Sequence, residues 1–488
     1  MGIVKSQSLK NLLSTYLGFG IGAINTLFLF TYLLTDTYYG LVTYLLSTAN
    51  LMMPLMAFGV HNTLVKFYSG YGTNGEQRKF TTMMLCLPAL VAIPLGIAGW
   101  LGFHWIEAFL TRRNPEVAPY IWTIFVIAFA LSYFEVFYAW SKVHLQTVYG
   151  NFLKEVFPRL CVMILLVLIA LDMLEVAHFI VAMVGVYVLR MLLMATSAFM
   201  VVKKPELEWG LPTNFRSILK YTSLIIIGGS VAVVFLDIDR FMINQYKEIQ
   251  NIAYYSVAVF IAVVIAVPAR ALHQITYPLT SGLMNSGKMD ELEALYKKSS
   301  INLFLVSGLI FLLIVLNVDQ LYLVLPETYR GGVIVVFLIA LAKLSDSLLG
   351  NNNAIIYNSD HYRMVLFFGL FLAVLTVLLN MVFIPLWGIN GAAFASLLAF
   401  LIFNATKLWF VKKKIGISPF SQNTFKTFLL ICALVLIFYF WNFSFHPLLN
   451  IALKAFLITV IYLVVAYRLR LSSEVNEEID KYIKKGTP

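Results

Sequence analysis

The stretch LDIDRF at positions 236–241 places two carboxylates, Asp237 and Asp239, with a single residue between them. Many glycosyltransferases hold a divalent metal with this Asp-x-Asp spacing, because carboxylate oxygens are preferred ligands of hard cations. Here neither a His nor a third carboxylate lies nearby, and Arg240 follows directly, which favours local charge pairing. We therefore expect no metal site. A cap at the outer end of a helix and the lining of a gate or cleft remain as alternatives.

Other charged residues interrupt long apolar runs, where an ionisable group costs roughly 2.5–3.5 kcal/mol at the centre of a membrane-spanning helix. Glu135 and Arg190 lie in two such runs, and Lys343 and Asp346 lie three residues apart in a third. Internal ion pairs, Lys343 with Asp346 and Glu135 with Arg190, are one interpretation. Contact with a charged cargo is the other. Arg270, just after a proline at the end of a run, is either an anchor at the inner membrane surface or a cargo ligand.

The elements that must position these residues follow from composition. The chain has 488 residues, of which 60% are apolar and 12% charged, about half the charged fraction of a soluble domain. Runs of roughly 20 apolar residues predict membrane-spanning helices. The fold class is therefore an all-α integral membrane protein with about fourteen spans. The predicted spans are 9–34, 38–60, 80–103, 119–140, 157–171, 177–201, 218–236, 252–273, 299–317, 332–356, 364–385, 389–411, 425–441 and 449–467.

The basic residues predict the orientation of these spans. Most of the 35 Lys and Arg fall in alternate connecting segments that start with the amino terminus. The opposite segments contain only Arg112, Arg113, Arg240, Lys247 and Arg330. Because cytoplasmic loops are rich in Lys and Arg, both termini are predicted to be cytoplasmic. The net charge of +11 then reflects topology and contact with anionic membrane lipids, and we expect no nucleic-acid partner.

The two halves of the chain resemble each other. DTYYGLVTYL at 36–45 is similar to IAYYSVAVFI at 252–261, and MVVKKPEL at 200–207 is similar to FVKKKIGI at 410–417. A parallel repeat of two six-helix lobes follows, with a cleft between them that is typical of an alternating-access transporter. The predicted parts are an amino-terminal lobe at 1–210, a second lobe at 211–416, two additional spans at 417–470 and a cytoplasmic tail at 471–488.

Three longer stretches carry a family resemblance. NMVFIPLWGINGAAFASLLAF at 380–400, DRFMINQYKEIQNIAYYSVA at 239–258 and the first helix with TYYGLVTYL resemble polysaccharide flippases of the O-antigen type. These form the oligosaccharide branch of the multidrug/oligosaccharidyl-lipid/polysaccharide (MOP) exporter superfamily. The resemblance implies movement of undecaprenyl-pyrophosphate-linked oligosaccharides across the bacterial inner membrane during surface polysaccharide or lipopolysaccharide biosynthesis. It implies no enzymatic activity and no cofactor, leaves H⁺ or Na⁺ open as a coupling ion, and suggests polymerase and assembly proteins as partners.

Three function classes follow from these observations. A membrane enzyme would need a large outer loop with paired catalytic residues, and every predicted outer loop is short. A drug or small-solute exporter of the MATE (multidrug and toxic compound extrusion) type would favour acidic residues in its cleft, whereas basic residues outnumber acidic ones within the spans. An anionic lipid-linked cargo fits best, because Arg offers a planar fork of donors to a pyrophosphate. The predicted cargo ligands are Arg270, Arg190, Lys343 and Asp346, and the predicted gating or coupling residues are Asp237, Asp239, Arg240 and Glu135.

Overall fold

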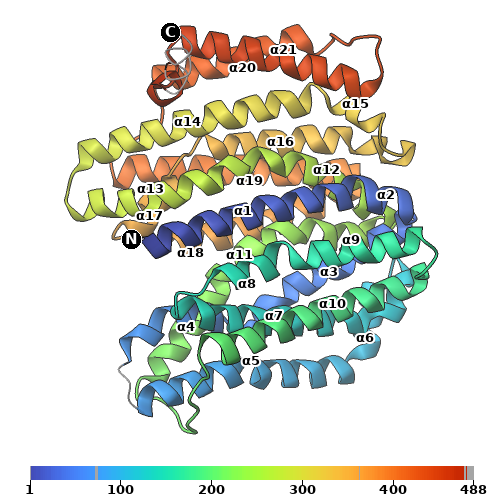
Figure 1. Cartoon of the computed structure of the whole chain (residues 1–488), viewed down its shortest axis with the longest axis vertical. Helices are drawn as coiled ribbons and strands as arrows, with labels where there is room; N and C mark the ends of the chain where they lie inside the picture. Colours follow the sequence, from blue (N-terminus) through green and yellow to red (C-terminus); the bar gives the residue numbers. More distant parts are fainter. Residues whose placement is uncertain (1, 72–74, 362, 478–479, 481–488) are drawn as a thin grey trace. The chain divides into compact units, whose positions relative to one another are not determined.

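The computed structural model describes residues 2–71, 75–361, 363–477 and 480, and these residues form helices without any strand. Within this part of the chain, eleven helical segments are long and apolar enough to cross a membrane (Figure 1). They are Lys10–Leu33, Asp36–Ala57, Gly75–Leu101, Pro115–Val143, Val176–Val202, Gln250–Arg270, Met289–Val315, Glu327–Ser347, Met364–Trp387, Ile389–Lys414 and Pro447–Arg468. The all-helical membrane fold is therefore confirmed.

Three predicted spans correspond to helices outside that set of eleven. The predicted short fifth span is α9 (Phe157–Ala170), with 14 residues. The thirteenth is α20 (Gln422–Phe438), a shorter apolar helix of 17 residues. The seventh is α11 (Phe215–Tyr246), with 32 residues, in which the side chains of 227–236 lie outside the description. A total of fourteen spans and the cytoplasmic placement of both termini stay predictions.

Residue packing divides the chain into two compact units, and the first is Met1–Ala253. In this unit α7 is central, because α3, α4, α5 and α10 all pack against it, and α11 packs on α3 and α4 (Figure 1). A buried cluster of apolar side chains, including Phe80, Phe134 and Trp140, fills the space between them. The helices are α1 (Gly2–Ile24), α2 (Phe30–Leu33), α3 (Asp36–Ala57), α4 (Val60–Phe67), α5 (Gly75–Leu101), α6 (Phe103–Leu110), α7 (Ile121–Val143), α8 (Val148–Glu155), α9, α10 (Val176–Thr196) and α11.

The second unit is Tyr254–Pro488. Here α19 packs against α16 and α18, while α14 packs against α13, α16 and α20. Gly391 lies so close to the carbonyl of Phe383 that a side chain at position 391 would overlap it, which explains the small residues in this stretch. The helices are α12 (Gln250–Val263, whose first four residues belong to the first unit), α13 (Val267–Asn285), α14 (Met289–Val315), α15 (Val318–Tyr322), α16 (Val333–Ser347), α17 (Asn352–Asn358), α18 (Met364–Trp387), α19 (Ile389–Lys414), α20 and α21 (Pro447–Arg468).

The predicted lobes and the observed units differ in where they assign α11. The sequence prediction placed a lobe boundary at residue 210, before α11, whereas packing assigns α11 to the first unit. The lobes at 1–210 and 211–416 describe a repeat of helices, and they stay a prediction.

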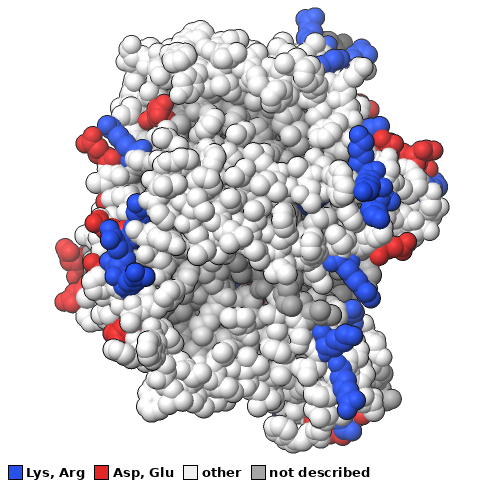
Figure 2. Space-filling model, turned by 180° about the vertical axis from the view of Figure 1, so that it is seen from behind, with Lys and Arg blue, Asp and Glu red and all other residues white. Residues whose placement is uncertain are grey.

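Exposed charged side chains are unevenly spread over the surface. On the face shown in Figure 2, the Lys and Arg side chains gather along the left and right edges of the view, and most of the remaining surface is white. Many large apolar side chains are exposed on the described helices, such as Leu90, Leu378 and Phe456, with 65%, 55% and 66% of their surface accessible. This distribution is the one that a bilayer requires, because lipid tails cannot solvate charge.

Candidate basic cluster in the first unit

Several charged residues of the first unit, among them Glu135, Lys154 and Arg190, come from α7, α8 and α10. Glu135 on α7 accepts a hydrogen bond from the ammonium of Lys154 on α8, with 2.5 Å between Oε1 and Nζ. The Glu135 side chain is 11% exposed and the Lys154 side chain 41% exposed. The carboxylate is therefore enclosed, while the ammonium remains accessible to a ligand. Lys142 and His61 also lie close enough to Glu135 to interact with it electrostatically.

Arg190 on α10 is buried, with 5% of its surface exposed. Its guanidinium carbon lies 3.8 Å from the ring centroid of Phe134 and 5.9 Å from that of Tyr187, so the aromatic faces stabilise its charge. Its Nε donates no hydrogen bond to any group that the structure describes. Of the two interpretations of Glu135 and Arg190, the ion pair between them is not formed, because Lys154 pairs with the carboxylate and Arg190 stacks on Phe134. Contact with a cargo stays a prediction.

Arg159 on α9 adds another basic group to this cluster. Its Nη1 donates to the carbonyl of Glu155 at 3.0 Å and to the Glu155 carboxylate at 3.3 Å. Asn25, in the π-helix η1 (Asn25–Leu29), donates to the Arg159 carbonyl at 2.7 Å and ties this site to the first helical segment. The basic cluster consists of Lys142, Lys154, Arg159 and Arg190 around two carboxylates, Glu135 and Glu155. Its charge is therefore net positive.

Asp237, Asp239 and Arg240 lie inside α11. The predicted span ended at 236, but the helix runs to Tyr246, so the three residues do not form a cap at a helix end. Asp237 and Arg240 form an ion pair of 3.0 Å one turn apart, and Asp237 also faces Ser47 of α3. Asp239 is buried, with 4% of its surface exposed. Among the residues that the structure describes, no group of three or more His, Cys, Asp or Glu side chains has a metal-binding arrangement.

The second unit holds its own buried charge on α19. Lys407 is 2% exposed, forms an ion pair of 3.8 Å with Asp346 of α16, and donates to Asn353 at 3.2 Å. Lys343, the predicted partner of Asp346, instead places its ammonium 4.3 Å from the ring centroid of Phe400. Of the two interpretations of Lys343 and Asp346, the internal pair is replaced by an ion pair of Asp346 with Lys407, which joins α16 to α19. Contact of either residue with a cargo stays a prediction.

Arg270 lies near the start of α13 and is exposed. The structure has one helical segment, Gln250–Arg270, where the eighth span was predicted, and it tightens into the 3-10 turn Val264–Ala266 shortly before Pro268. Proline has no backbone N–H to donate and is favoured in the first turn of a new helix. Arg190 and Arg270 belong to different units, so their joint contact with one cargo stays a prediction.

Four basic residues of these sites were missing from the predicted set: Lys142, Lys154, Arg159 and Lys407. All four were assigned to inner segments, because they lie near the ends of apolar runs. Some signals were available. Glu155 and Arg159 have the i, i+4 spacing of a helical ion pair, and Lys407 is followed by the apolar residues LWFV before the true end at Lys412–Lys414.

The arrangement can bind an anion, because it combines an excess of positive charge with a buried N–H of Arg190 that has no partner among the described groups and with the accessible ammonium of Lys154. Solved structures with the same fold are transporters. The lipid II flippase MurJ in an inward closed conformation matches 95% of this chain and 98% of its own, with a TM-score of 0.71 and 14% identity. An inward-facing multidrug resistance MATE family transporter of the MOP superfamily matches 84% of this chain and 94% of its own, with a TM-score of 0.59 and 14% identity. The fold is therefore that of MOP transporters.

The family is narrower than the fold. The family model for polysaccharide biosynthesis proteins matches residues 7–284, which is more than half of the chain. This chain belongs to that family, and the predicted relation to the polysaccharide flippases of the MOP superfamily is confirmed. No curated protein sequence matches the chain significantly.

Proposed function

We propose that this protein is a flippase for undecaprenyl-pyrophosphate-linked oligosaccharides. It would carry them from the inner to the outer leaflet of the bacterial cytoplasmic membrane by alternating access, for the synthesis of surface polysaccharide of the O-antigen type. The observation that carries the proposal is Arg190, a buried guanidinium whose Nε has no partner among the described groups and which lies in a cluster with excess positive charge. A pyrophosphate supplies the complementary charge and acceptors.

Each basic residue of the cluster has a separate task in this proposal. Arg190 would donate its free N–H to the pyrophosphate while Phe134 holds the guanidinium plane in place. Lys154, the more accessible partner of its ion pair, would leave Glu135 and turn to the cargo. Binding would then replace the Lys154–Glu135 ion pair by a Lys154–pyrophosphate ion pair. This replacement can favour a second conformation of the protein only if the cargo binds that conformation more tightly. Arg270 would add charge from the second unit.

The test uses the purified full chain in vesicles that contain a fluorescent polyprenyl-pyrophosphate oligosaccharide, with leaflet exposure measured by a membrane-impermeant quencher. With wild-type protein, the fluorescent lipid should move between the two leaflets, so that the quencher eventually reaches lipid from both. An Arg190→Ala, Arg270→Ala double variant should abolish exchange while still inserting in the membrane. Arg112→Met, which removes an exposed arginine outside the cluster, is the matched control and should exchange normally. Normal exchange by the well-expressed double variant would contradict the proposal.

A MATE-like exporter of drugs or small solutes is the second candidate, because the fold also matches those transporters. The buried carboxylates Asp237 and Asp239 would then bind a cation. The same vesicles distinguish the two functions. Uptake of a cationic dye without movement of the lipid-linked sugar would favour the exporter.

A metal-dependent enzyme is the third function class, and it predicts that a divalent chelator abolishes activity. If Asp237 and Asp239 hold no catalytic metal, a divalent chelator should leave lipid exchange unchanged in wild type and in Asp239→Asn alike. Loss of exchange with chelator, restored by added metal in the wild type alone, would revive the enzyme hypothesis. The proposal also includes a coupling ion, H⁺ or Na⁺, and a polymerase or other assembly protein as partner. A gradient of H⁺ or Na⁺ across the vesicle membrane that changes the rate of lipid exchange would identify the coupling ion.

A further inference from the structure

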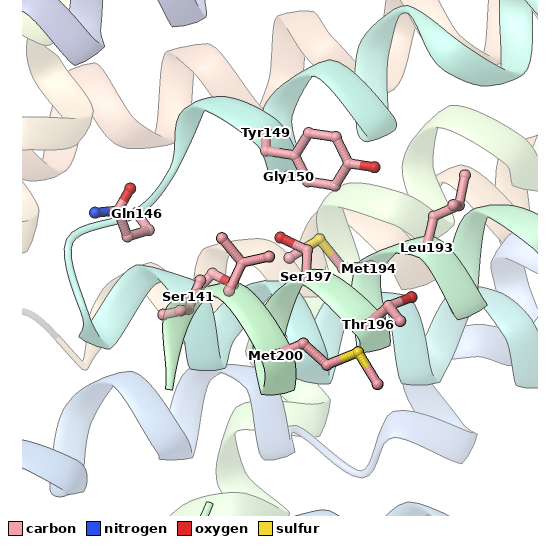
Figure 3. A pocket seen from close by; sticks show the side chains of 11 residues that line it. Ser141, Gln146, Tyr149, Gly150, Leu193, Met194, Thr196, Ser197 and Met200 are labelled. Carbon is pink, nitrogen blue, oxygen red and sulfur yellow. The ribbon is translucent and has the colours of Figure 1, made fainter. Parts of the chain in front are cut away.

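The first unit contains a cavity of about 600 Å³ that the transport proposal does not use. It lies between the end of α7, the start of α8, and the π-helix η4 (Ser197–Val202) that continues α10. Figure 3 shows Tyr149 and Gly150 of α8 on one side and Leu193, Ser197 and Met200 on the other.

Two local features shape the walls of the cavity. Gly150 lies against the ring of Tyr138 of α7, and a side chain at 150 would overlap that ring, so the glycine lets α8 approach α7 closely at this wall. On the opposite wall the helix widens into η4, which ends where the Lys203 N–H donates to the Ala198 carbonyl at 3.2 Å. Single π-helical turns of this kind are frequent at functional sites.

The lining has two chemical characters. Leu193, Met194, Met200 and Val201 offer an apolar wall in which the methionines adapt easily to an irregular partner. Gln146, Tyr149 and Ser197 add polar groups, and their side chains form no hydrogen bond within the part of the chain that is described. The cavity therefore suits a molecule with an apolar chain and several hydrogen-bond acceptors.

The depth of the cavity narrows the choice of ligand. It lies in the last turns of the span Val176–Val202, directly before Lys203 and Lys204, at the end that the basic residues assign to the cytoplasm. Met200 and Val201 at its rim are 82% and 81% exposed, so the opening is next to lipid. Lipid headgroups occupy this level, and a juxtamembrane lysine attracts an anionic leaflet by about 1 kcal/mol.

We propose that this cavity binds one anionic glycerophospholipid of the cytoplasmic leaflet. An acyl chain would lie on Leu193, Met194 and Met200. The ester and phosphate oxygens would accept from Tyr149 and Ser197. Lys203 and Lys204 directly follow the lining residue Val202 but line a separate pocket with Arg78, and they would favour an anionic headgroup as juxtamembrane charges and not as part of the cavity wall. A polyprenyl pyrophosphate also carries hydrogen-bond acceptors in its headgroup, so undecaprenyl phosphate is included in the experiment below as the competing occupant. The site thus concerns the surrounding membrane lipid and does not depend on which cargo the protein moves.

The experiment is native mass spectrometry of the full chain, released from vesicles of phosphatidylcholine and phosphatidylglycerol in equal parts. Wild type should retain phosphatidylglycerol in preference to phosphatidylcholine. Replacing both lysines, Lys203→Gln with Lys204→Gln, should lower that preference about fivefold per lysine, which is the effect of ~1 kcal/mol each. Met200→Asp at the exposed rim should release the anionic lipid, whereas Met200→Lys should keep it, which separates charge from packing.

The second part of the experiment fills the cavity with a large side chain. Ser197→Trp should lose the retained lipid, and Leu192→Trp, an exposed neighbour outside the lining, should keep it. Equal phosphatidylglycerol retention by Ser197→Trp, Met200→Asp and wild type would overturn the proposal. Displacement of the retained lipid by added undecaprenyl phosphate would also overturn it, because the occupant would then be the cargo chain.

Discussion

The substitution Arg190→Met should affect the stability of the protein and its transport activity in different ways, and it therefore distinguishes a structural role of Arg190 from a role in cargo binding. A buried charge without an ion-pair partner loses several kcal/mol of solvation, which stacking on Phe134 at 3.8 Å offsets by about 2 kcal/mol. Methionine keeps much of the volume and removes the charge. Replacing buried ionic groups by apolar ones of similar size is often neutral or stabilising by ~1–4 kcal/mol. The apparent melting temperature in detergent should therefore stay the same or rise by a few degrees.

Transport should change in the opposite direction. Losing a hydrogen bond to a charged group costs ~1.5–3 kcal/mol, so cargo affinity should fall by roughly tenfold to a hundredfold. The assay is the initial rate of lipid exchange in vesicles at a cargo concentration below saturation. Arg190→Lys should recover part of the rate, because the charge remains but the planar fork is lost.

A second arginine provides the control. Arg159 is paired with the Glu155 carboxylate, so Arg159→Met leaves that carboxylate without its cation and should lower the melting temperature. If Arg190→Met also melts earlier and loses transport only in proportion to folded protein, Arg190 is structural. If it transports like the wild type, the proposed cargo contact is refuted.

Three shorter predictions follow. Lys407→Met should lower the free energy of unfolding by ~1 kcal/mol and so lower the melting temperature modestly. The loss is smaller than the ~3–5 kcal/mol typical of a fully buried pair, because its carboxylate partner is 41% exposed. Gly350→Ala should be strongly destabilising in the same melting assay, because φ is +51° and the new Cβ would lie 2.6 Å from a backbone nitrogen, whereas Gly331→Ala, with open space around it, should be neutral. Reporter fusions at Lys204 should be cytoplasmic and those at Asn114 external. An inversion at either position would refute the predicted topology.

The fold was largely predictable because lipid imposes a simple rule on sequence. A helix that crosses a bilayer must be apolar over its length, and the eleven spans of the structure all coincide with predicted ones. The errors fall where the rule weakens. α11 continues beyond its apolar part to Tyr246, because Asp237 and Arg240 neutralise each other within the protein. A hydropathy argument ends the helix at the first charge and cannot detect such a pair.

The sites were less predictable, because sequence shows which charges are near a span but not which neighbour each one meets. Glu135 needed a cation, and Arg190 was a reasonable choice until Lys154 proved closer in space. Asp346 likewise pairs across helices with Lys407 and not along its own helix with Lys343. In both cases the true partner lies on a different helix near an apparent loop, and only tertiary packing brings it within reach.

These corrections strengthen the inference of an anionic cargo. If Glu135 had paired with Arg190, both charges would have been explained by structure alone. With Glu135 held by Lys154, the guanidinium of Arg190 remains a buried charge whose Nε has no acceptor among the described groups. Such a charge opposes folding. An apolar side chain at this position would remove that cost, and apolar residues are what this chain, with only 12% charged residues, has at most positions. Its presence beside further cations is what a site for a doubly charged pyrophosphate requires, because the same desolvation that disfavours the empty site strengthens every contact to a bound anion.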